Sequence, residues 1–296
     1  MLSILIPVKD YNCSLLIEAL HAQGERLQVP YEILIGEDGS SQELLTLNAI
    51  ADRLPNCRRI IKETNVGRAA IRNLLAAEAQ YPNLIFIDCD AAVERENFLA
   101  DYLQALKECP VVCGGLYHPD KQPGGNCSLR YKYEKQADKF RDAATRSKAP
   151  YDKFATFCFA IRREVFEAIR FDTSITEYGY EDALFGKELK RRSIAIKHID
   201  NPLMHTGLEE NRIYLSKIER SLHTLAGIKE KIGSTALTNA AGRLERSHLT
   251  WLFMIFWRAA KPLIVKNLLG TAPSLKALNI YKLGYYIQCR RGKQIQ

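Results

Sequence analysis

One stretch constrains the fold more than any other: a short apolar run that ends in two carboxylates separated by one residue. Residues 84–87 are all apolar, which is typical of a strand buried on both faces of a parallel sheet. Asp88 and Asp90 follow, and side chains two residues apart on an extended chain share a face. Two such carboxylates repel each other unless a cation compensates them, and Mg²⁺ and Mn²⁺ prefer oxygen ligands. The stretch predicts a buried strand that ends at a metal or ligand site, with a helix N-cap as the alternative.

Apolar runs of this kind alternate with helical patterns over the first hundred residues. Residues 68–80 carry the apolar side of a helix, and three further runs read as strands, over residues 3–8, 32–36 and 59–62. This alternation predicts a parallel sheet with right-handed crossovers. Glu37 and Asp38 follow the second of these strands, at the edge where ligands of open α/β sheets bind. No G-x-G-x-x-G follows the first strand, which argues against a dinucleotide-binding domain.

A second acidic cluster, Glu181 and Asp182, stands at the head of a later helical pattern. The helix macrodipole favours acids in a first turn, and this alone would explain the pair. A carboxylate positioned there, directly after Tyr180, would also suit a general base. His205 stands beside a glycine turn further on. A lone histidine is most often a hydrogen-bonded structural residue, but a metal site with few carboxylates would use it as a ligand.

The length of the chain and the distribution of its charge predict a large domain with an appendage. A chain of 296 residues with 47% apolar content can bury a sizeable core. We expect a catalytic domain over residues 1–225, with halves at 1–100 and 101–225, followed by a helical region over 226–296. The net charge is +8, and residues 243–296 hold ten Lys and Arg against Glu245 alone, which is +9 and leaves −1 for the rest. The basic end therefore needs its own explanation.

Residues 247–296 combine this positive charge with an apolar, tryptophan-bearing segment. Trp251 and Trp257 bound an apolar run that is much shorter than the ~18 residues needed to span a bilayer. Such a segment suits a helix lying on an anionic membrane surface. The alternatives are packing against the body of the chain or against a second copy in a homodimer. A nucleic-acid partner is not expected, because the body of the chain lacks a basic, aromatic platform.

The cysteines and the first residues bear on localisation. The eight cysteines form no C-x-x-C pair, which argues against a zinc site. The opening residues lack the basic segment and cleavage site of a signal peptide. We expect a cytoplasmic protein, with the inner face of the cytoplasmic membrane as the alternative location.

Six stretches, in this order, resemble the family-2 glycosyltransferases: SILIPVKDYN, IGEDGSS, NVGRAAIRN, LIFIDCDAAV, FDTSITEYGYEDALFGKEL and HIDNPLMHTG. Together they span residues 1 to about 220. The resemblance implies a GT-A fold, a Rossmann-like mixed α/β sheet flanked by helices. It also implies inverting transfer of a hexose from a nucleotide diphosphate sugar, with uridine diphosphate as the expected carrier. The implied acceptor is a glycan or a lipid-linked oligosaccharide in cell-surface polysaccharide synthesis, and the implied cofactor is Mn²⁺ or Mg²⁺.

The resemblance also assigns roles to residues. Asp182 is the implied base, and Glu181 holds the acceptor or orients the nearby loop. Asp90 and His205 are the implied metal ligands, joined by Asp88, which also touches the ribose or sugar. The implied nucleotide-sugar-binding residues are Pro7, Val8, Tyr11, Glu37, Asp38, Asn65, Arg68, Arg72, Asn73, Asp88 and Cys89.

The chain departs from the family pattern at three places. Ala91 follows Asp90 where members often carry a third acid, so the metal site depends on fewer carboxylates. Tyr178 stands where related enzymes often have tryptophan. The Q-x-x-R-W signature of processive synthases is missing, which favours transfer of a single sugar.

Two other interpretations remain open at this point. A sugar nucleotidyltransferase, or a protein that only binds nucleotide sugars, has a related architecture. The former should carry a glycine-rich, arginine-containing phosphate loop after the first strand, and Lys9-Asp10-Tyr11 is not one. A non-catalytic scaffold on a membrane is the other option, and the retained acids and His205 argue against it.

Overall fold

The structure, a computed structural model, describes residues 1–122, 126–174 and 178–293 and divides the chain into two compact units. Unit 1 comprises Met1–Pro119, Asp138–Thr176 and Glu181–Gly207. Unit 2 comprises Asp120–Ala137, Glu177–Tyr180 and Leu208–Gln296. The last segment of unit 1 ends at Gly207, whereas the sequence predicted that the catalytic domain extends to residue 225.

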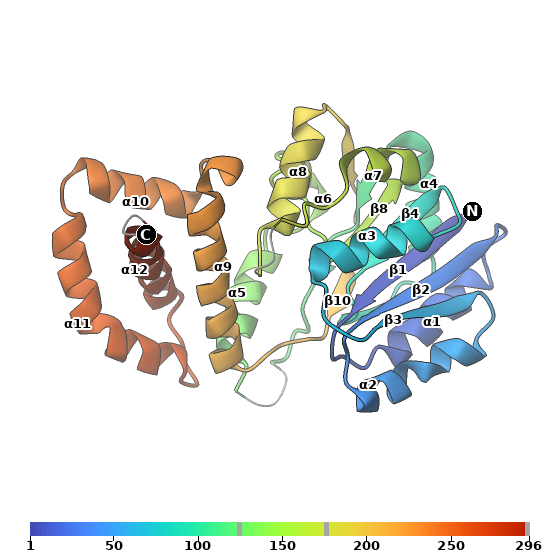
Figure 1. Cartoon of the computed structure of the whole chain (residues 1–296), viewed down its shortest axis with the longest axis horizontal. Helices are drawn as coiled ribbons and strands as arrows, with labels where there is room; N and C mark the ends of the chain where they lie inside the picture. Colours follow the sequence, from blue (N-terminus) through green and yellow to red (C-terminus); the bar gives the residue numbers. More distant parts are fainter. Residues whose placement is uncertain (123–125, 175–177, 294–296) are drawn as a thin grey trace. The chain divides into compact units, whose positions relative to one another are not determined.

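A mixed seven-stranded sheet forms the centre of unit 1, in the order β3-β2-β1-β4-β8-β6-β9 (Figure 1). The first four strands of the chain are mutually parallel: β1 (Leu2–Val8), β2 (Tyr31–Asp38), β3 (Cys57–Lys62) and β4 (Asn83–Ile87). β8 (Cys158–Arg162) runs antiparallel between β4 and β6 (Val111–Cys113), and β9 (Ile196–His198) is parallel to β6. The mixed α/β sheet expected from the sequence is thereby confirmed.

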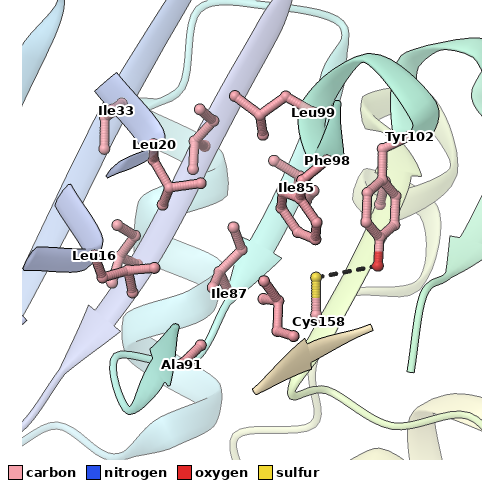
Figure 2. Close-up of a cluster of buried hydrophobic side chains, with 14 of the residues drawn as sticks. Leu16, Leu20, Ile33, Ile85, Ile87, Ala91, Phe98, Leu99, Tyr102 and Cys158 are labelled. Atoms are coloured by element: carbon pink, nitrogen blue, oxygen red, sulfur yellow. Dashed lines mark hydrogen bonds between the residues drawn. The ribbon is translucent and has the colours of Figure 1, made fainter. Parts of the chain in front are cut away.

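Helices cover both faces of this sheet, because alternate strand residues point to opposite sides. On one face, Leu16 and Leu20 of α1 (Ser14–Gly24) and Phe98 of α4 (Phe98–Glu108) pack on Ile33 and Ile85 (Figure 2). The hydroxyl of Tyr102 lies 3.1 Å from Cys158 Sγ at the margin of this core.

The second face carries α3 (Arg68–Glu78), α7 (Arg163–Ile169) and α8 (Glu181–Arg191). Phe86 stacks on Phe159 there with 4.8 Å between ring centroids, and Phe166 and Phe185 extend the aromatic cluster. Shorter elements complete the unit: α2 (Gln42–Leu47), η1 (Asn48–Arg53) and α6 (Ala143–Ser147).

A second, three-stranded sheet of very short strands joins distant parts of unit 1. β10 (Leu203–His205) pairs antiparallel with β5 (Ala91–Ala92) and parallel with β7 (Leu116–Tyr117). Gly114 and Gly115 separate β6 from β7. Gly115 has φ 89°, which L-residues with a side chain rarely adopt, so the break is built into the sequence. The small sheet places His205 opposite Ala91, next to Asp90.

Unit 2 is helical, with α5 (Ser128–Asp138), α9 (Asn211–Ile232), α10 (Ala236–Arg246), α11 (Thr250–Leu268) and α12 (Leu275–Lys293). α12 packs against α9, α10 and α11. The buried ring of Trp257 approaches Gly284 so closely that a Cβ there would lie 2.2 Å from it, which explains the glycine. In the part of the chain that the structure describes, each helix is too short or too polar to cross a membrane.

Candidate active site

β4 delivers Asp88 to the edge of the sheet, where a buried arginine meets it. The backbone N–H of Asp88 donates to the carbonyl of Phe157 at 2.9 Å, which fixes the chain as it leaves the strand. Arg72 of α3 is 2% exposed, and its Nη2 donates to Asp88 Oδ1 at 2.5 Å. A guanidinium removed from water needs such a carboxylate, so the pair fixes both side chains. Asp88 is therefore engaged by Arg72, and its predicted contact with a metal or a sugar stays a prediction.

Asp90 and His205 lie together, as the predicted metal site requires. His205 Nε2 is 3.2 Å from Asp90 Oδ2. The neighbouring Thr206 fixes this approach, since its backbone N–H and its Oγ1 both donate to the carbonyl of Asp90, at 2.9 and 2.8 Å. A Cβ at Gly207 would lie 2.5 Å from Asp90 Oδ2, so only glycine leaves the Asp90 carboxylate in this position.

The chemistry of this pair suits a divalent cation. A carboxylate oxygen and an imidazole nitrogen are both ligands of Mn²⁺, and Mg²⁺ is commonly held by one or two carboxylates together with substrate phosphates. Within residues 1–122, 126–174 and 178–293, His, Cys, Asp and Glu side chains form no group of three or more that could hold a metal. Asp90 and His205 thus fit a cation whose remaining ligands come from a substrate or from water.

Two aromatic rings flank His205, and the sequence analysis identified neither of them as a site residue. The rings of His118 and Phe157 each have their centroid 5.1 Å from that of His205. His118 is buried, and its Nδ1 lies 3.0 Å from Asp138 Oδ1. The ring of His118, held by Asp138, thus packs against the imidazole of His205. The sequence gives no signal for this, because His118 opens a polar, proline-containing loop.

Glu181 and Asp182 occupy the first turn of α8, as expected. Arg68 of α3 lies near the pair, with its Nη1 3.5 Å from Glu181 Oε1. Burial raises the pKa of Asp182 to about 6, and the negative charge of Glu181 adds to the shift. The positive charge of Arg72 acts on Asp182 in the opposite sense, so Arg72 is in electrostatic range of both Asp88 and Asp182. Residues 175–177, which belong to the same sequence stretch, lie outside the described residues.

The two acids at the end of β2 form hydrogen bonds within the protein. The carboxylate of Asp38 accepts the backbone N–H groups of Val66 and Gly67 at 2.6 and 3.1 Å, which anchors the turn before α3. Glu37 is fully buried, and its Oε1 accepts from Asn48 Nδ2 at 2.8 Å. The sequence predicted contacts of both acids with the nucleotide, and those contacts stay predictions.

The other predicted nucleotide-binding residues differ in what they contact. Tyr11 belongs with the Asp90 cluster, because its hydroxyl lies 3.0 Å from Thr206 Oγ1. Asn73 is committed to the fold, since its side-chain amide donates to the Phe171 carbonyl and accepts the Phe171 N–H, at 3.0 and 2.9 Å. Pro7 and Val8 are the last two residues of β1, where they pair with Gly36 and Glu37 of β2. Asn65 Nδ2 donates to the Asp38 carbonyl at 3.4 Å, and Cys89 is half-buried between the two aspartates.

The mixed sheet with acids at the end of its fourth strand, the small second sheet and the acid-headed helix define a GT-A fold. Residues 3–170, more than half of the chain, match the model of the family described as glycosyl transferase family 2. The chain belongs to this family, and it is a glycosyltransferase.

Several solved structures share the fold. TarS residues 1–349 from S. aureus is 15% identical, covers 98% of this chain and 91% of its own, and has a TM-score of 0.54. The mannosyltransferase PcManGT from Pyrobaculum calidifontis, in complex with GDP-Man and Mn²⁺, is 13% identical over 99% of this chain and 86% of its own, with a TM-score of 0.57.

Glucosyl-3-phosphoglycerate synthase from Mycobacterium tuberculosis is a further match, in complex with Mn²⁺, UDP and glucosyl-3-phosphoglycerate. It is 14% identical over 79% of this chain and 81% of its own, with a TM-score of 0.51. At these identities the likeness concerns the fold alone. No curated protein matches the chain.

Proposed function

We propose that this glycosyltransferase moves one sugar, with inversion, from a nucleotide diphosphate sugar to a hydroxyl of a glycan or a lipid-linked oligosaccharide in cell-surface polysaccharide synthesis. The observation that carries the proposal is the 3.2 Å approach of His205 Nε2 to Asp90 Oδ2 at the mouth of the sheet. A uridine diphosphate sugar is the expected donor. TarS in complex with UDP-GlcNAc, of the same fold, supports this choice.

Asp90 and His205 would hold Mn²⁺ or Mg²⁺ in this proposal. The cation would supply Lewis-acid stabilisation of the negative charge that develops on the diphosphate. The complexes of PcManGT and of the mycobacterial synthase with Mn²⁺ support the choice of ion. Asp88, held by Arg72, would accept hydrogen bonds from the hydroxyls of the ribose or the sugar, and Tyr11 would line the nucleotide side.

Asp182 is the proposed base. The acceptor oxygen attacks the anomeric carbon while the bond from that carbon to the diphosphate oxygen breaks and its electron pair leaves with the diphosphate. The acceptor proton passes to the Asp182 carboxylate, a contribution of roughly 10²–10⁴-fold. A pKa of about 6 keeps this carboxylate ionised near neutral pH and still basic enough to accept the proton. Glu181 would hold the acceptor, with Arg68 fixing its position.

The basic C-terminal helices would bring the enzyme to the inner face of the cytoplasmic membrane, where a lipid-linked acceptor lies. Several large apolar residues of α11 support this, because they stand exposed on unit 2, among them Trp251 at 60%, Ile255 at 58% and Phe256 at 55%. The positive charge of residues 243–296 complements an anionic lipid surface.

Three variants and two measurements test the proposal. Thermal unfolding with UDP-sugars, with and without Mn²⁺, reports donor binding, since a ligand at 100 times its Kd adds about 2.7 kcal/mol. Asp182→Asn should retain this stabilisation and lose transfer at least 100-fold. Asp90→Asn should lose the Mn²⁺-dependent part of the stabilisation. Asp101→Asn, which removes a surface carboxylate of α4, serves as the matched control and should change neither. Equal loss of donor binding and of transfer in Asp182→Asn would refute the assignment of the base.

A further inference from the structure

A cavity of about 600 Å³ is lined by residues of unit 2. Its walls come from three helices and the turn between two of them. Its lining includes Glu245, His248, Thr250, Trp251, Arg290 and Arg291. Three of these six side chains are basic, so the cavity is suited to an anion.

The turn between α10 and α11 is fixed by the backbone. His248 adopts φ 56°, the left-handed conformation that ends many helices. The N–H of His248 donates to the carbonyl of Glu245, and the N–H of Leu249 donates to the carbonyl of Leu244, at 3.1 and 3.2 Å. This pair of bonds is a Schellman motif, and it lets α11 begin at Thr250, beside the imidazole of His248.

The charges of the cavity do not cancel. Arg290 Nη1 pairs with Glu245 Oε1, which neutralises one cation with one anion. Arg291 is exposed and forms no ion pair with any residue that the structure describes. The cavity therefore presents the Arg291 guanidinium, joined by the exposed imidazole of His248.

The start of α11, at Thr250 and Trp251, forms part of the cavity wall. The Oγ1 of Thr250 is buried and has no hydrogen-bond partner among the described residues. Leu249, the N-cap of α11, offers no side-chain cap to the N–H groups of the first turn. A 19-residue helix adds the positive end of its dipole at this point. The uncapped start of a helix and a guanidinium that line one cavity match the oxygens of a phosphate group.

An exposed apolar face continues from the cavity along α11. Trp251, which lines the cavity, is 60% exposed, and Leu252 beside it and Ile255 and Phe256 one turn further on are each more than half exposed. Trp251 and Ile255 are four residues apart, as are Leu252 and Phe256, so each pair lies on one face of the helix. A ligand that satisfies both features carries a phosphate next to hydrocarbon, and an anionic lipid in a bilayer presents this combination at every headgroup.

We propose that this cavity binds the phosphate of an anionic lipid headgroup while the apolar face of α11 enters the bilayer interface. The inference rests on the membrane association proposed above, and it adds a defined headgroup site to it. The site does not involve Asp182 or Asp90. Its success or failure is thus separable from that of the transfer reaction.

The test is cosedimentation of the full chain with vesicles of phosphatidylcholine, alone or with phosphatidate. We expect the unaltered chain to bind the phosphatidate vesicles at least tenfold more tightly. The double variant His248→Gln/Arg291→Gln should lose at least tenfold of that affinity. The matched control, Arg212→Gln/Lys229→Gln on α9, changes the same kind of surface side chains and should stay within twofold. Asp182→Asn should bind vesicles as the unaltered chain does.

Several outcomes would overturn the inference. Equal losses in the double variant and its control would mean that only net charge matters. Equal binding to both kinds of vesicle would mean that the cavity does not select an anionic headgroup over a zwitterionic one. Stabilisation by inorganic phosphate without binding to any vesicle would assign the cavity to a free anion. Thermal unfolding of each variant in the absence of vesicles checks that the fold is intact, and Thr250→Val gives a second, uncharged probe of the same cavity.

Discussion

His205 Nε2 lies 3.2 Å from Asp90 Oδ2, and Gly207 has just enough room beside them. Gly207→Ala would place a Cβ 2.5 Å from Asp90 Oδ2, so the carboxylate must move. We expect at least a tenfold loss of transfer and a weaker response to Mn²⁺ in thermal unfolding. In the control Gly242→Ala, the new Cβ would approach Arg246 no closer than 3.6 Å. That variant should be fully active and more stable by about 0.5–1 kcal/mol. Full activity in Gly207→Ala would contradict the proposed cation site.

The pH dependence of transfer should report Asp182. Its carboxylate must be ionised to accept a proton, so kcat/KM should fall as the pH drops through about 6. Glu181 raises this pKa by its negative charge, and Glu181→Gln should move the acidic limb of the profile to lower pH. Glu188→Gln, on the same helix but paired with Arg191 and Arg192, should leave the limb in place. An acidic limb that does not respond to Glu181→Gln would assign it to another group.

The same pKa makes a prediction about stability. Because the folded-state pKa of Asp182 lies above its unfolded value of 3.8, ionisation of the carboxylate destabilises the fold as the pH rises through about 6. Asp182→Asn cannot ionise and avoids this cost. Its free energy of unfolding, relative to the unaltered chain, should rise by about 1–2 kcal/mol between pH 4.5 and pH 7.5. Urea unfolding at the two pH values measures the difference, and a difference that shrinks with rising pH would be the wrong sign.

The buried pair of Arg72 and Asp88 should matter for stability as well as for the site. Arg72→Met leaves a partly buried carboxylate without its partner, and we expect a loss of about 2–4 kcal/mol. The double variant Arg72→Met/Asp88→Asn should recover part of this, because the uncompensated charge is gone. Arg58→Met breaks the exposed pair with Glu78, 3.1 Å apart, and should cost less than about 1 kcal/mol. Similar losses in both single variants would mean that burial does not strengthen the first pair.

Sequence reasoning reached the parallel half of the sheet because its strands are continuous apolar runs between helical patterns. It placed the second strand over residues 32–36, but β2 continues to Asp38, and this is why both of its terminal acids are buried. Strands of two or three residues carry no detectable period, so β5, β7 and β10 could not be predicted. The antiparallel direction of β8 could not be predicted either, because the direction of a strand in a sheet depends on which strands it pairs with in the folded chain.

The sequence likewise predicted some residues of the candidate site and not others. Asp88, Asp90, Glu181, Asp182 and His205 were identified because they interrupt apolar patterns or resemble a family motif. Their partners were harder to find. His118 was missed, and the engagement of Asn73 with Phe171 and of Asp38 with the turn before α3 became visible only in the fold. A side chain's hydrogen-bond partners depend on chain crossings that no local pattern encodes. The family match favours glycosyl transfer over nucleotidyl transfer and over a scaffold.

The reversed direction of β8 has a practical consequence for protein engineering. One rim of the sheet holds the C-terminal ends of β1, β2 and β4 together with the N-terminal end of β8. Phe157 lies beside Asp88 at this rim. The opposite rim, where β4 begins at Asn83 and β8 finishes at Arg162, carries none of the proposed catalytic groups. A fluorophore or an affinity handle attached along that far rim would therefore leave the proposed catalytic groups untouched.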